Sequence, residues 1–345
     1  MARGSVSVKD VARRAGVSLG TVSNVLNRAH LVRPSTRAKV EAAIAELGFV
    51  RNESARHLRA GRSRTIAYVM LDATNPFFTD VARGVDDVAR AAGLTLFLCN
   101  SDQDRQREAD YLDQLLENRV RGVLITAVDY ANPRLRSLPR LGVPVVLVDR
   151  RPGAGAPWCS VGVDDVAGGD LAVTHLLEQG HTQVAFAGGP LSIPQVEDRY
   201  AGAIQAIRRA GLADDSLRLL ATRALNVAEG RRVGERLLGL PAKTRPTAAF
   251  CANDLLALGV LQHMTQAGVA VPDELAIVGY DDIDFAAAAA VPLTSVNQPR
   301  HLLGSAAAEL LLEEERDGVA HEHRYVEFPP ELVVRASSNP RRPIG

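Results

Sequence analysis

Cysteine is scarce in this sequence, and long hydrophobic runs are absent. Only three cysteines occur among 345 residues, Cys99, Cys159 and Cys251, and none belongs to a C-x-x-C motif. This usage predicts buried thiols in a reducing cytoplasm. No apolar run approaches the roughly 20 residues that span a membrane, and the first residues, MARGSVSVKDVARRAGVS, lack the apolar core of a secretory signal. We therefore expect a cytoplasmic protein with no membrane partner.

The chain also has no excess of either charge: 40 Lys and Arg residues balance 40 Asp and Glu residues, so the formal net charge is zero. The charges are nevertheless segregated along the chain. Residues 1–64 carry 13 Lys or Arg against 4 Asp or Glu, which leaves the remaining chain acidic. A small basic segment attached to an acidic body indicates a module that binds a polyanion, and nucleic acid is the polyanion that we expect.

The first 60 residues predict short helices and no strand. Apolar residues recur there at three- and four-residue spacing, for example Val8, Val11, Ala12 and Ala15. Residue types that start and stop helices delimit three such segments. The first segment begins after Ser7, with Asp10 completing a capping box, and ends at Gly16. The second begins at Ser18 and ends at Asn27, and the third begins at Pro34 and ends at Gly48.

The pattern changes at Thr65, where continuous apolar runs alternate with amphipathic, helix-length segments. The runs are TIAYVMLD, LTLFLCNS, GVLITAV and PVVLVDR, with helices predicted over 79–92 and 104–118. Runs without alternation predict a parallel sheet that helices cover on both faces. The pattern restarts near residue 180 with QVAFAGG, LRLLAT, TAAFCAND and LAIVGYDD, separated by helices predicted over 196–210, 227–239 and 255–267. The chain returns through LTSVNQP, a helix near 300–317 and strands around 324–336.

These patterns predict a small all-α helix-turn-helix head followed by an α/β core of two doubly wound parallel-sheet subdomains. Two such units in series usually bind a ligand in the cleft between them, at the carboxyl ends of the strands. The predicted boundaries are 1–50 for the head, 51–64 for one further short helix and a linker, and 65–345 for the core. Within the core we expect a first subdomain of residues 65–163 and 294–322 and a second of residues 164–293 and 323–340.

One motif in the head permits a different interpretation. Residues 16–20, GVSLG, match the G-x-S-x-G nucleophile elbow of hydrolases. That motif needs a strand before the serine, whereas a helix is predicted before Ser18 and the first strand follows about 45 residues later. No convincing acidic residue and histidine complete a triad. We therefore favour a DNA-reading turn over an esterase and expect no enzyme activity.

The head sequence VSVKDVARRAGVSLGTVSNVLN, with LVRPSTRAKVEAAIAELGFVRNESARHLRAGRSRTIAYV after it, resembles the lactose-repressor (LacI/GalR) family of transcriptional regulators. The similarity continues through NPFF, GHTQVAFAGGP, CANDLLALG and IVGYDD to VPLTSVNQP, and so covers almost the whole chain. It implies a homodimeric repressor that binds a pseudo-palindromic double-stranded operator under the control of a small-molecule effector. No apolar heptad helix follows the core, so we do not expect a tetramer built on such a helix.

The resemblance places the second helix of the head in the major groove. Its base-reading positions fall on Leu19, Gly20 and Asn24, of which only Asn24 offers strong hydrogen bonds. Phosphate contacts are expected from residues that position the head without reading sequence. These residues are Ser7, Thr21, Ser23 and Asn27. Ser18 caps the start of the same helix.

Residues 52–60 resemble the family's hinge helix. Paired hinge helices enter the minor groove, where an apolar side chain opens a base step. Leu58 occupies the wedge position, and Ala55 is the small residue beside it. Because this helix is too polar to be stable alone, its folding can couple dimer spacing to operator contact.

The resemblance also locates an effector site, at positions shared with periplasmic ribose-type binding proteins. Phenylalanines can stack on the C–H face of a sugar, and carboxylates with guanidiniums suit vicinal hydroxyls. The expected residues are Asn75, Phe77, Phe78, Asp149, Arg150, Asp164, Arg199, Leu225, Asn253, Asp281 and Gln298.

Leu225 stands where many relatives have an aromatic residue that covers the other face of the ligand. One-sided stacking disfavours a pyranose and leaves pentoses, polyols or a nucleoside open. Asp149 and Arg150 offer charged groups rather than an aromatic slot, which favours a sugar over the alternative, a purine corepressor. A transporter's solute-binding protein is the other alternative, but it would have a signal peptide and no basic head. We expect no cofactor, and His321-Glu322-His323 in a charged loop is not expected to hold a metal.

Overall fold

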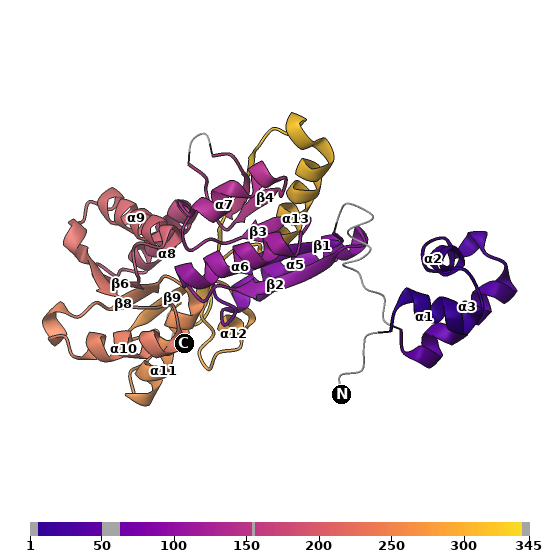
Figure 1. Ribbon diagram of the computed structural model, residues 1–345. Helices are drawn as coiled ribbons and strands as arrows, with labels where there is room; N and C mark the ends of the chain where they lie inside the picture. Colours follow the sequence, from indigo (N-terminus) through magenta and orange to yellow (C-terminus); the bar gives the residue numbers. More distant parts are fainter. Residues whose placement is uncertain (1–5, 50–62, 154–155, 340–345) are drawn as a thin grey trace. The chain divides into compact units, whose positions relative to one another are not determined.

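The computed structural model describes residues 6–49, 63–153 and 156–339. The chain divides into two units, Met1–Ser63 and Arg64–Gly345, which we describe separately (Figure 1). The predictions for Ala55 and Leu58 lie outside the described residues. None of the described helices is long and apolar enough to cross a membrane.

The first unit is a three-helix head whose ends follow the local sequence signals. Its helices are α1 (Val8–Ala15), α2 (Leu19–Asn27) and α3 (Pro34–Leu47), with a 3-10 turn η1 (Ala29–Leu31) before α3. Ser7 and Asp10 form the predicted capping box, and Ser18 caps α2 through the backbone N–H of Thr21. Gly16 adopts the left-handed conformation that ends α1, with φ of 66°. Six small side chains form the core: Val11, Ala12, Val22, Val25, Val40 and Ala43.

The first subdomain of the core contains a parallel sheet in the order β11-β5-β4-β3-β1-β2. Its strands are β1 (Thr65–Met70), β2 (Thr95–Asn100), β3 (Val123–Ile125), β4 (Val145–Val148), β5 (Cys159–Val163) and β11 (Tyr325–Phe328). One face packs on α5 (Pro76–Ala91) and α13 (Arg300–Asp317), and the other on α6 (Arg105–Glu117) and α7 (Pro133–Ser137). A Cβ on Gly84 of α5 would lie 2.1 Å from the carbonyl oxygen of His301, so glycine is what allows α5 and α13 to pack so closely.

The second subdomain repeats this arrangement in the order β12-β10-β9-β8-β6-β7, with β12 antiparallel to β10. Its strands are β6 (Val184–Gly188), β7 (Leu217–Ala221), β8 (Ala248–Cys251), β9 (Ala276–Asp281), β10 (Thr294–Asn297) and β12 (Glu331–Val333). Its helices are α8 (Asp165–Glu178), α9 (Pro194–Arg209), α10 (Val227–Leu238), α11 (Asp254–Gln266) and the short α12 (Asp284–Ala287). Figure 1 shows α8 and α9 on one side of the sheet and α10 and α11 on the other. The remaining 3-10 turns are η2 (Pro139–Leu141), η3 (Asp214–Ser216), η4 (Ala242–Thr244) and η5 (Gly318–Ala320).

The late returns of the chain correct the predicted subdomain boundaries. We assigned 294–322 to the first subdomain, but β10 pairs with β9 and extends the second sheet. We assigned 323–340 to the second, but β11 pairs with β5 in the first sheet. The chain therefore crosses between subdomains after β5, after β10 and after β11.

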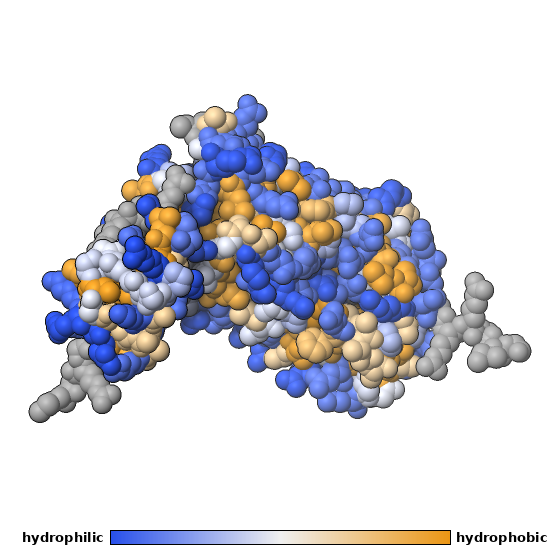
Figure 2. Space-filling model, turned by 90° about the vertical axis from the view of Figure 1, so that its right-hand side faces the viewer, coloured by the Kyte–Doolittle hydropathy of each residue, from blue (hydrophilic) through white to orange (hydrophobic). Residues whose placement is uncertain are grey.

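Strand β2 departs from the prediction that helices cover both faces of every strand. It is an edge strand, and its side chains Phe97 and Leu98 are 47% and 53% exposed. Figure 2 shows apolar side chains in separate patches on a mainly hydrophilic face of the molecule.

The three cysteines are buried free thiols, as predicted.

Candidate functional site

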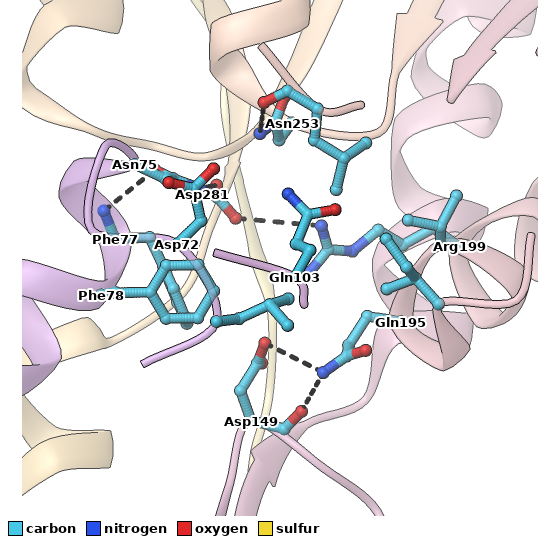
Figure 3. A pocket seen from close by; sticks show the side chains of 14 residues that line it. Asp72, Asn75, Phe77, Phe78, Gln103, Asp149, Gln195, Arg199, Asn253 and Asp281 are labelled. Atoms are coloured by element: carbon cyan, nitrogen blue, oxygen red, sulfur yellow. Dashed lines mark hydrogen bonds and ion pairs between the residues drawn. The ribbon is translucent and has the colours of Figure 1, made fainter. Parts of the chain in front are cut away.

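A cavity lies between the two subdomains, at the carboxyl ends of their parallel strands (Figure 3). It contains about 460 Å³ of space that no atom occupies, including a part open to solvent. Side chains from both sheets line it, so closure or opening of the cleft would change its shape. The lining residues are Leu71, Asp72, Asn75, Phe77, Phe78, Gln103, Asp149, Ile193, Gln195, Val196, Arg199, Leu225, Asn253 and Asp281.

The first subdomain contributes the aromatic wall. Asn75 caps α5, because its Oδ1 accepts a hydrogen bond from the N–H of Phe77 at 3.0 Å. The capped turn brings the rings of Phe77 and Phe78 together edge to face, with centroids 5.0 Å apart. The amide of Asn75 also donates to Asp281 Oδ2 at 3.0 Å, a hydrogen bond that joins the two subdomains. The wall is therefore both apolar and anchored to the opposite subdomain.

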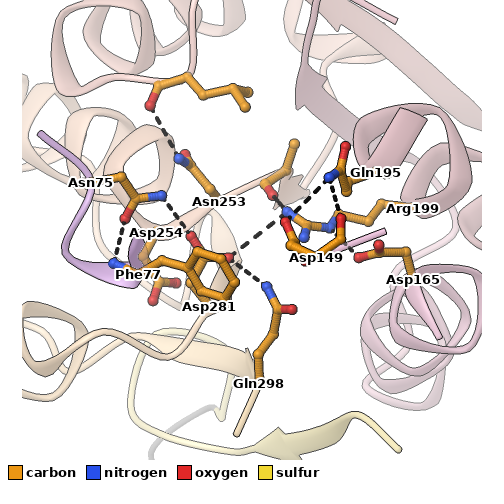
Figure 4. Close-up of polar contacts among 12 residues, drawn as sticks. Asn75, Phe77, Asp149, Asp165, Gln195, Arg199, Asn253, Asp254, Asp281 and Gln298 are labelled. Carbon is orange, nitrogen blue, oxygen red and sulfur yellow. Dashed lines mark hydrogen bonds and ion pairs between the residues drawn. The ribbon is translucent and has the colours of Figure 1, made fainter. Parts of the chain in front are cut away.

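Arg199 is the central cation of the second subdomain. Its Nε donates to Asp165 Oδ1 at 2.8 Å and its Nη1 to the carbonyl oxygen of Ala252 at 2.7 Å (Figure 4). The guanidinium lies 3.6 Å from the ring centroid of Tyr280 and 3.9 Å from Asp281 Oδ1. Burial opposes its charge, but Asp165, Tyr280 and Asp281 outweigh burial and raise the pKa of Arg199. A buried, permanently charged donor therefore faces the cavity.

Asp149 faces Arg199 from the end of β4. Its backbone is in the left-handed region, with φ of 58°, which is uncommon for a residue with a side chain and typical of functional sites. Gln195 donates to its carbonyl oxygen and, at 3.3 Å, to its Oδ2. Burial and the nearby charge of Asp165 raise the pKa of Asp149. Its Oδ1 is buried and accepts no hydrogen bond from the described residues, which leaves one acceptor for a ligand.

Asp281 and Asn253 complete the polar wall at the ends of β9 and β8. Asp281 accepts hydrogen bonds from Asn75 and, at 2.9 Å, from the amide of Gln298. Its backbone is also left-handed, with φ of 99°, and burial raises its pKa against the opposing effect of Arg199. Asn253 caps α11 and donates to the carbonyl oxygen of Leu225 at 3.1 Å. These side chains are held in place before any ligand arrives, which reduces the entropy cost of binding.

Eight of the eleven expected effector residues line this cavity. The other three do not reach it. Gln298 is buried and hydrogen-bonded to Asp281, Arg150 lies over the ring of Tyr130 at 5.0 Å, and Asp164 caps α8 through the N–H of Ala167. Sequence reasoning missed six lining residues, which are Leu71, Asp72, Gln103, Ile193, Gln195 and Val196. Leu71 and Asp72 could have been found from their place directly after β1, whereas Ile193, Gln195 and Val196 lie at the start of α9, several residues after β6.

The head presents the exposed face of α2. Leu19 is 47% exposed, and Gly20 and Asn24 are also exposed. The side chain of Asn24 makes no hydrogen bond within residues 6–49, so its amide is available to a ligand. By contrast, the Ser18 hydroxyl accepts from the N–H of Thr21, and the Asn27 amide donates to the carbonyl oxygen of Ser23.

Comparisons with known proteins agree with both units. The model of bacterial regulatory proteins of the lacI family matches residues 7–52, and that of the periplasmic binding protein-like domain matches residues 173–338. The HTH-type transcriptional repressor PurR of Aliivibrio fischeri is 35% identical, over 97% of this chain and 99% of that protein. The ribose operon repressor of Escherichia coli is 36% identical, over 96% and 99%.

Solved structures show the same architecture. The lac repressor dimer bound to operator is 28% identical with a TM-score of 0.82, over 97% of this chain and 99% of that one. A LacI family regulator from Enterococcus faecium with bound ribose is 29% identical with a TM-score of 0.73, over 81% and 100%. A DNA-binding head, a two-subdomain core and full-length similarity to repressors coincide in one molecule. The chain belongs to the lacI family of bacterial regulatory proteins, DNA-binding transcriptional repressors under small-molecule control.

Proposed function

We propose that this repressor binds a pseudo-palindromic operator as a homodimer in the cytoplasm, and that a pentose, D-ribose, in the cavity sets its operator affinity. The observation that carries the effector class is the pairing of a one-sided aromatic wall with buried, preorganised charged groups. We assign no catalytic step to this cavity.

The polar groups suit a ligand with several hydroxyls. Each hydroxyl both donates and accepts, so it can donate to Asp149 Oδ1 while it accepts from Arg199. Hydrogen bonds to charged partners are about twice as strong as neutral ones. The cavity therefore combines the unpaired acceptor Asp149 Oδ1 with the buried guanidinium of Arg199. This combination favours the hydroxyl groups of a sugar over an apolar ligand.

The apolar groups favour a small ring. Phe77 and Phe78 lie on one side, and Leu225 lines the cavity where a second aromatic would enclose a larger ring. The ribose operon repressor and the ribose-bound E. faecium regulator support the same choice. The similarity to PurR keeps a purine as the second candidate, which requires stacking that Leu225 does not supply.

Operator reading is assigned to α2. Asn24 offers a bidentate amide to adenine, and Leu19 an apolar contact to a thymine methyl. Because these two side chains read few base pairs, we assign the remaining specificity to the hinge, residues 51–64, with Leu58 as the wedge and Ala55 beside it.

The dimer interface is assigned to the outer edge of the first subdomain. Phe97 and Leu98 expose apolar surface on β2, and Ala82 and Leu96 line an adjoining groove between α5 and β2. Exposed apolar surface on an edge strand is a typical interaction site. A second copy paired about a two-fold axis would cover it and set the spacing of two heads.

A thermal-shift comparison of D-ribose, cellobiose and guanine tests the effector assignment. A ligand that binds only the folded state stabilises by about 2.7 kcal/mol at a hundredfold excess over its Kd, so D-ribose should raise the melting temperature and Arg199→Ala should remove the increase. An increase with guanine and none with D-ribose would establish the purine alternative.

Operator duplex selected from a random pool then shows the direction of the response. The fluorescence anisotropy of this duplex is measured with and without D-ribose. A change in affinity with wild type, and none with Arg199→Ala, would support control through the cavity.

A further inference from the structure

Four residues with metal-binding side chains converge far from the effector cavity. Cys159 is the first residue of β5, Glu314 lies on α13, and His321 and His323 lie between η5 and β11. One ligand atom from each residue lies within 4.8 Å of every other. The cavity lies at the carboxyl ends of the strands, whereas Cys159 begins its strand, so this cluster is a separate feature.

The separations between these atoms are close to those of a tetrahedral metal site. Cys159 Sγ lies 3.0 Å from His321 Nε2 and 3.9 Å from His323 Nδ1, and His323 Nδ1 lies 4.0 Å from Glu314 Oε2. Tetrahedral zinc, with bonds of about 2.0–2.3 Å, holds neighbouring ligand atoms roughly 3.3–3.8 Å apart. Side-chain rotations that move the atoms by about 1 Å would therefore close the cluster around one ion.

The buried carboxylate of Glu314 has a long contact with His323, at 4.0 Å, but no close cationic partner among the described residues. Its side chain is only 11% exposed, and its Oε2 is buried with no hydrogen bond among the described residues. The nearby Arg324 pairs with Glu313 instead, at 2.5 Å. A buried carboxyl without a cation is costly, and a bound metal would remove that cost.

We propose that Cys159, Glu314, His321 and His323 bind one Zn²⁺ ion. Thiolate and imidazole ligands select zinc and similar metals, whereas Mg²⁺ and Ca²⁺ prefer all-oxygen sites. One thiolate and one carboxylate balance the two positive charges of the ion, which leaves a neutral site. The side chain of His323 is 34% exposed, so the ion has a route from solvent.

All four ligands belong to the first subdomain, and this determines what the ion would do. It would tie the end of α13 to β5 and to the segment that leads into β11, the outer strand of the sheet. Such a closed set with four protein ligands is typical of a structural site rather than a catalytic one. Binding therefore stabilises the first subdomain without occupying the effector cavity.

Cobalt titration of the chelator-treated, full-length protein tests the site. Co²⁺ should bind once per chain and give the absorption bands of tetrahedral cobalt with a thiolate ligand, and Zn²⁺ should displace it. Cys159→Ser should abolish the thiolate band, and Cys99→Ser, which changes another buried thiol, should leave it intact.

A second pair of variants tests the site independently, in case Cys159→Ser does not fold. His323→Ala changes a partly exposed side chain, and it should weaken Zn²⁺ binding at least about tenfold, as loss of groups around metal sites does. His301→Ala, on the exposed face of α13, should bind as wild type does. Failure of wild type to bind Co²⁺ or Zn²⁺ would overturn the proposal, as would full binding by both Cys159→Ser and His323→Ala.

Discussion

The two subdomains of the core share one strand order but differ at their outer edges. In the first, edge strand β2 exposes Phe97 and Leu98, whereas in the second the equivalent edge strand, β7, exposes Arg218 and Ala221. Their strand order is the same, so the fold itself does not require apolar residues at an edge. This difference is the basis on which we proposed β2, rather than β7, as the dimer edge.

The subdomains also differ at the cavity between them. The first contributes the rings of Phe77 and Phe78, and the second contributes Arg199, Asn253 and Asp281. A sugar ring with apolar C–H groups and polar hydroxyls needs both kinds of wall. Each subdomain therefore supplies half of a site, and effector binding depends on how they approach.

The largest effect is expected from substitutions on β2, the exposed edge strand of the first subdomain. Phe97→Glu with Leu98→Glu should separate the dimer, because each large apolar side chain contributes about 1.5–3 kcal/mol on burial. Sedimentation velocity should show monomers, and operator affinity should fall by at least about a hundredfold. Arg218→Glu, on the edge strand of the second subdomain, is the matched control and should remain dimeric. Equal dissociation in both variants would show that the interface lies elsewhere.

The next largest effect is on D-ribose affinity, when one residue is changed in each wall of the cavity. Arg199→Ala leaves Asp165 and Asp281 without their cation, so D-ribose affinity should fall by about a hundredfold or more and the core should also lose stability. Phe78→Leu removes only a stacking contact worth about 1 kcal/mol, which predicts a roughly fivefold loss. Calorimetric titration measures both, and a larger loss for Phe78→Leu would reverse the assignment of the walls.

Changes in the head should leave both core functions intact and so separate DNA reading from them. Asn24→Ala should weaken operator binding by about 1–3 kcal/mol, the value of one bidentate base contact. Ser23→Ala is the matched comparison, since it removes an expected phosphate contact on the same helix and no base contact. Unequal effects measured by fluorescence anisotropy support the assignment, whereas equal losses would mean that α2 only positions the head.

The smallest effect is a difference in acid stability. Burial lowers the pKa of His175 on α8 below its ordinary value of 6.5, so this histidine binds fewer protons in the folded chain than in the unfolded chain. Stability should therefore fall as the pH drops below that value. Thermal unfolding at about pH 8 and about pH 5.5 measures it, and His175→Asn should reduce the difference. Greater stability of wild type in acid would contradict this sign.

Local signals made much of the fold predictable. Ser7, Ser18 and Gly16 delimit helices through contacts within a few residues, so their neighbours alone determine the outcome. The strand-end positions of Asn75, Asp149 and Asp281 followed from the resemblance, and the parallel topology brings them to one cavity. The choice of sheet for β10 and β11 depends on distant partners, which explains the misplaced boundaries.

Long-range placement explains what the sequence could not show. Gln195 reaches Asp149 across the cavity from a different subdomain, and no spacing in the chain encodes that contact. Likewise, His321 and His323 alone did not suggest a metal site, because Cys159 and Glu314 join them only in the folded chain.

Direct titration of D-ribose into the full-length protein tests the central claim, that the two unlike walls form one sugar site. We expect one ribose per chain in wild type and near-complete loss of ribose binding in Arg199→Ala. In the absence of ribose, Phe78→Leu and Arg199→Ala should both bind operator as wild type does, because neither substitution lies in the head. No binding of D-ribose by wild type, or equal binding by wild type and Arg199→Ala, would contradict it.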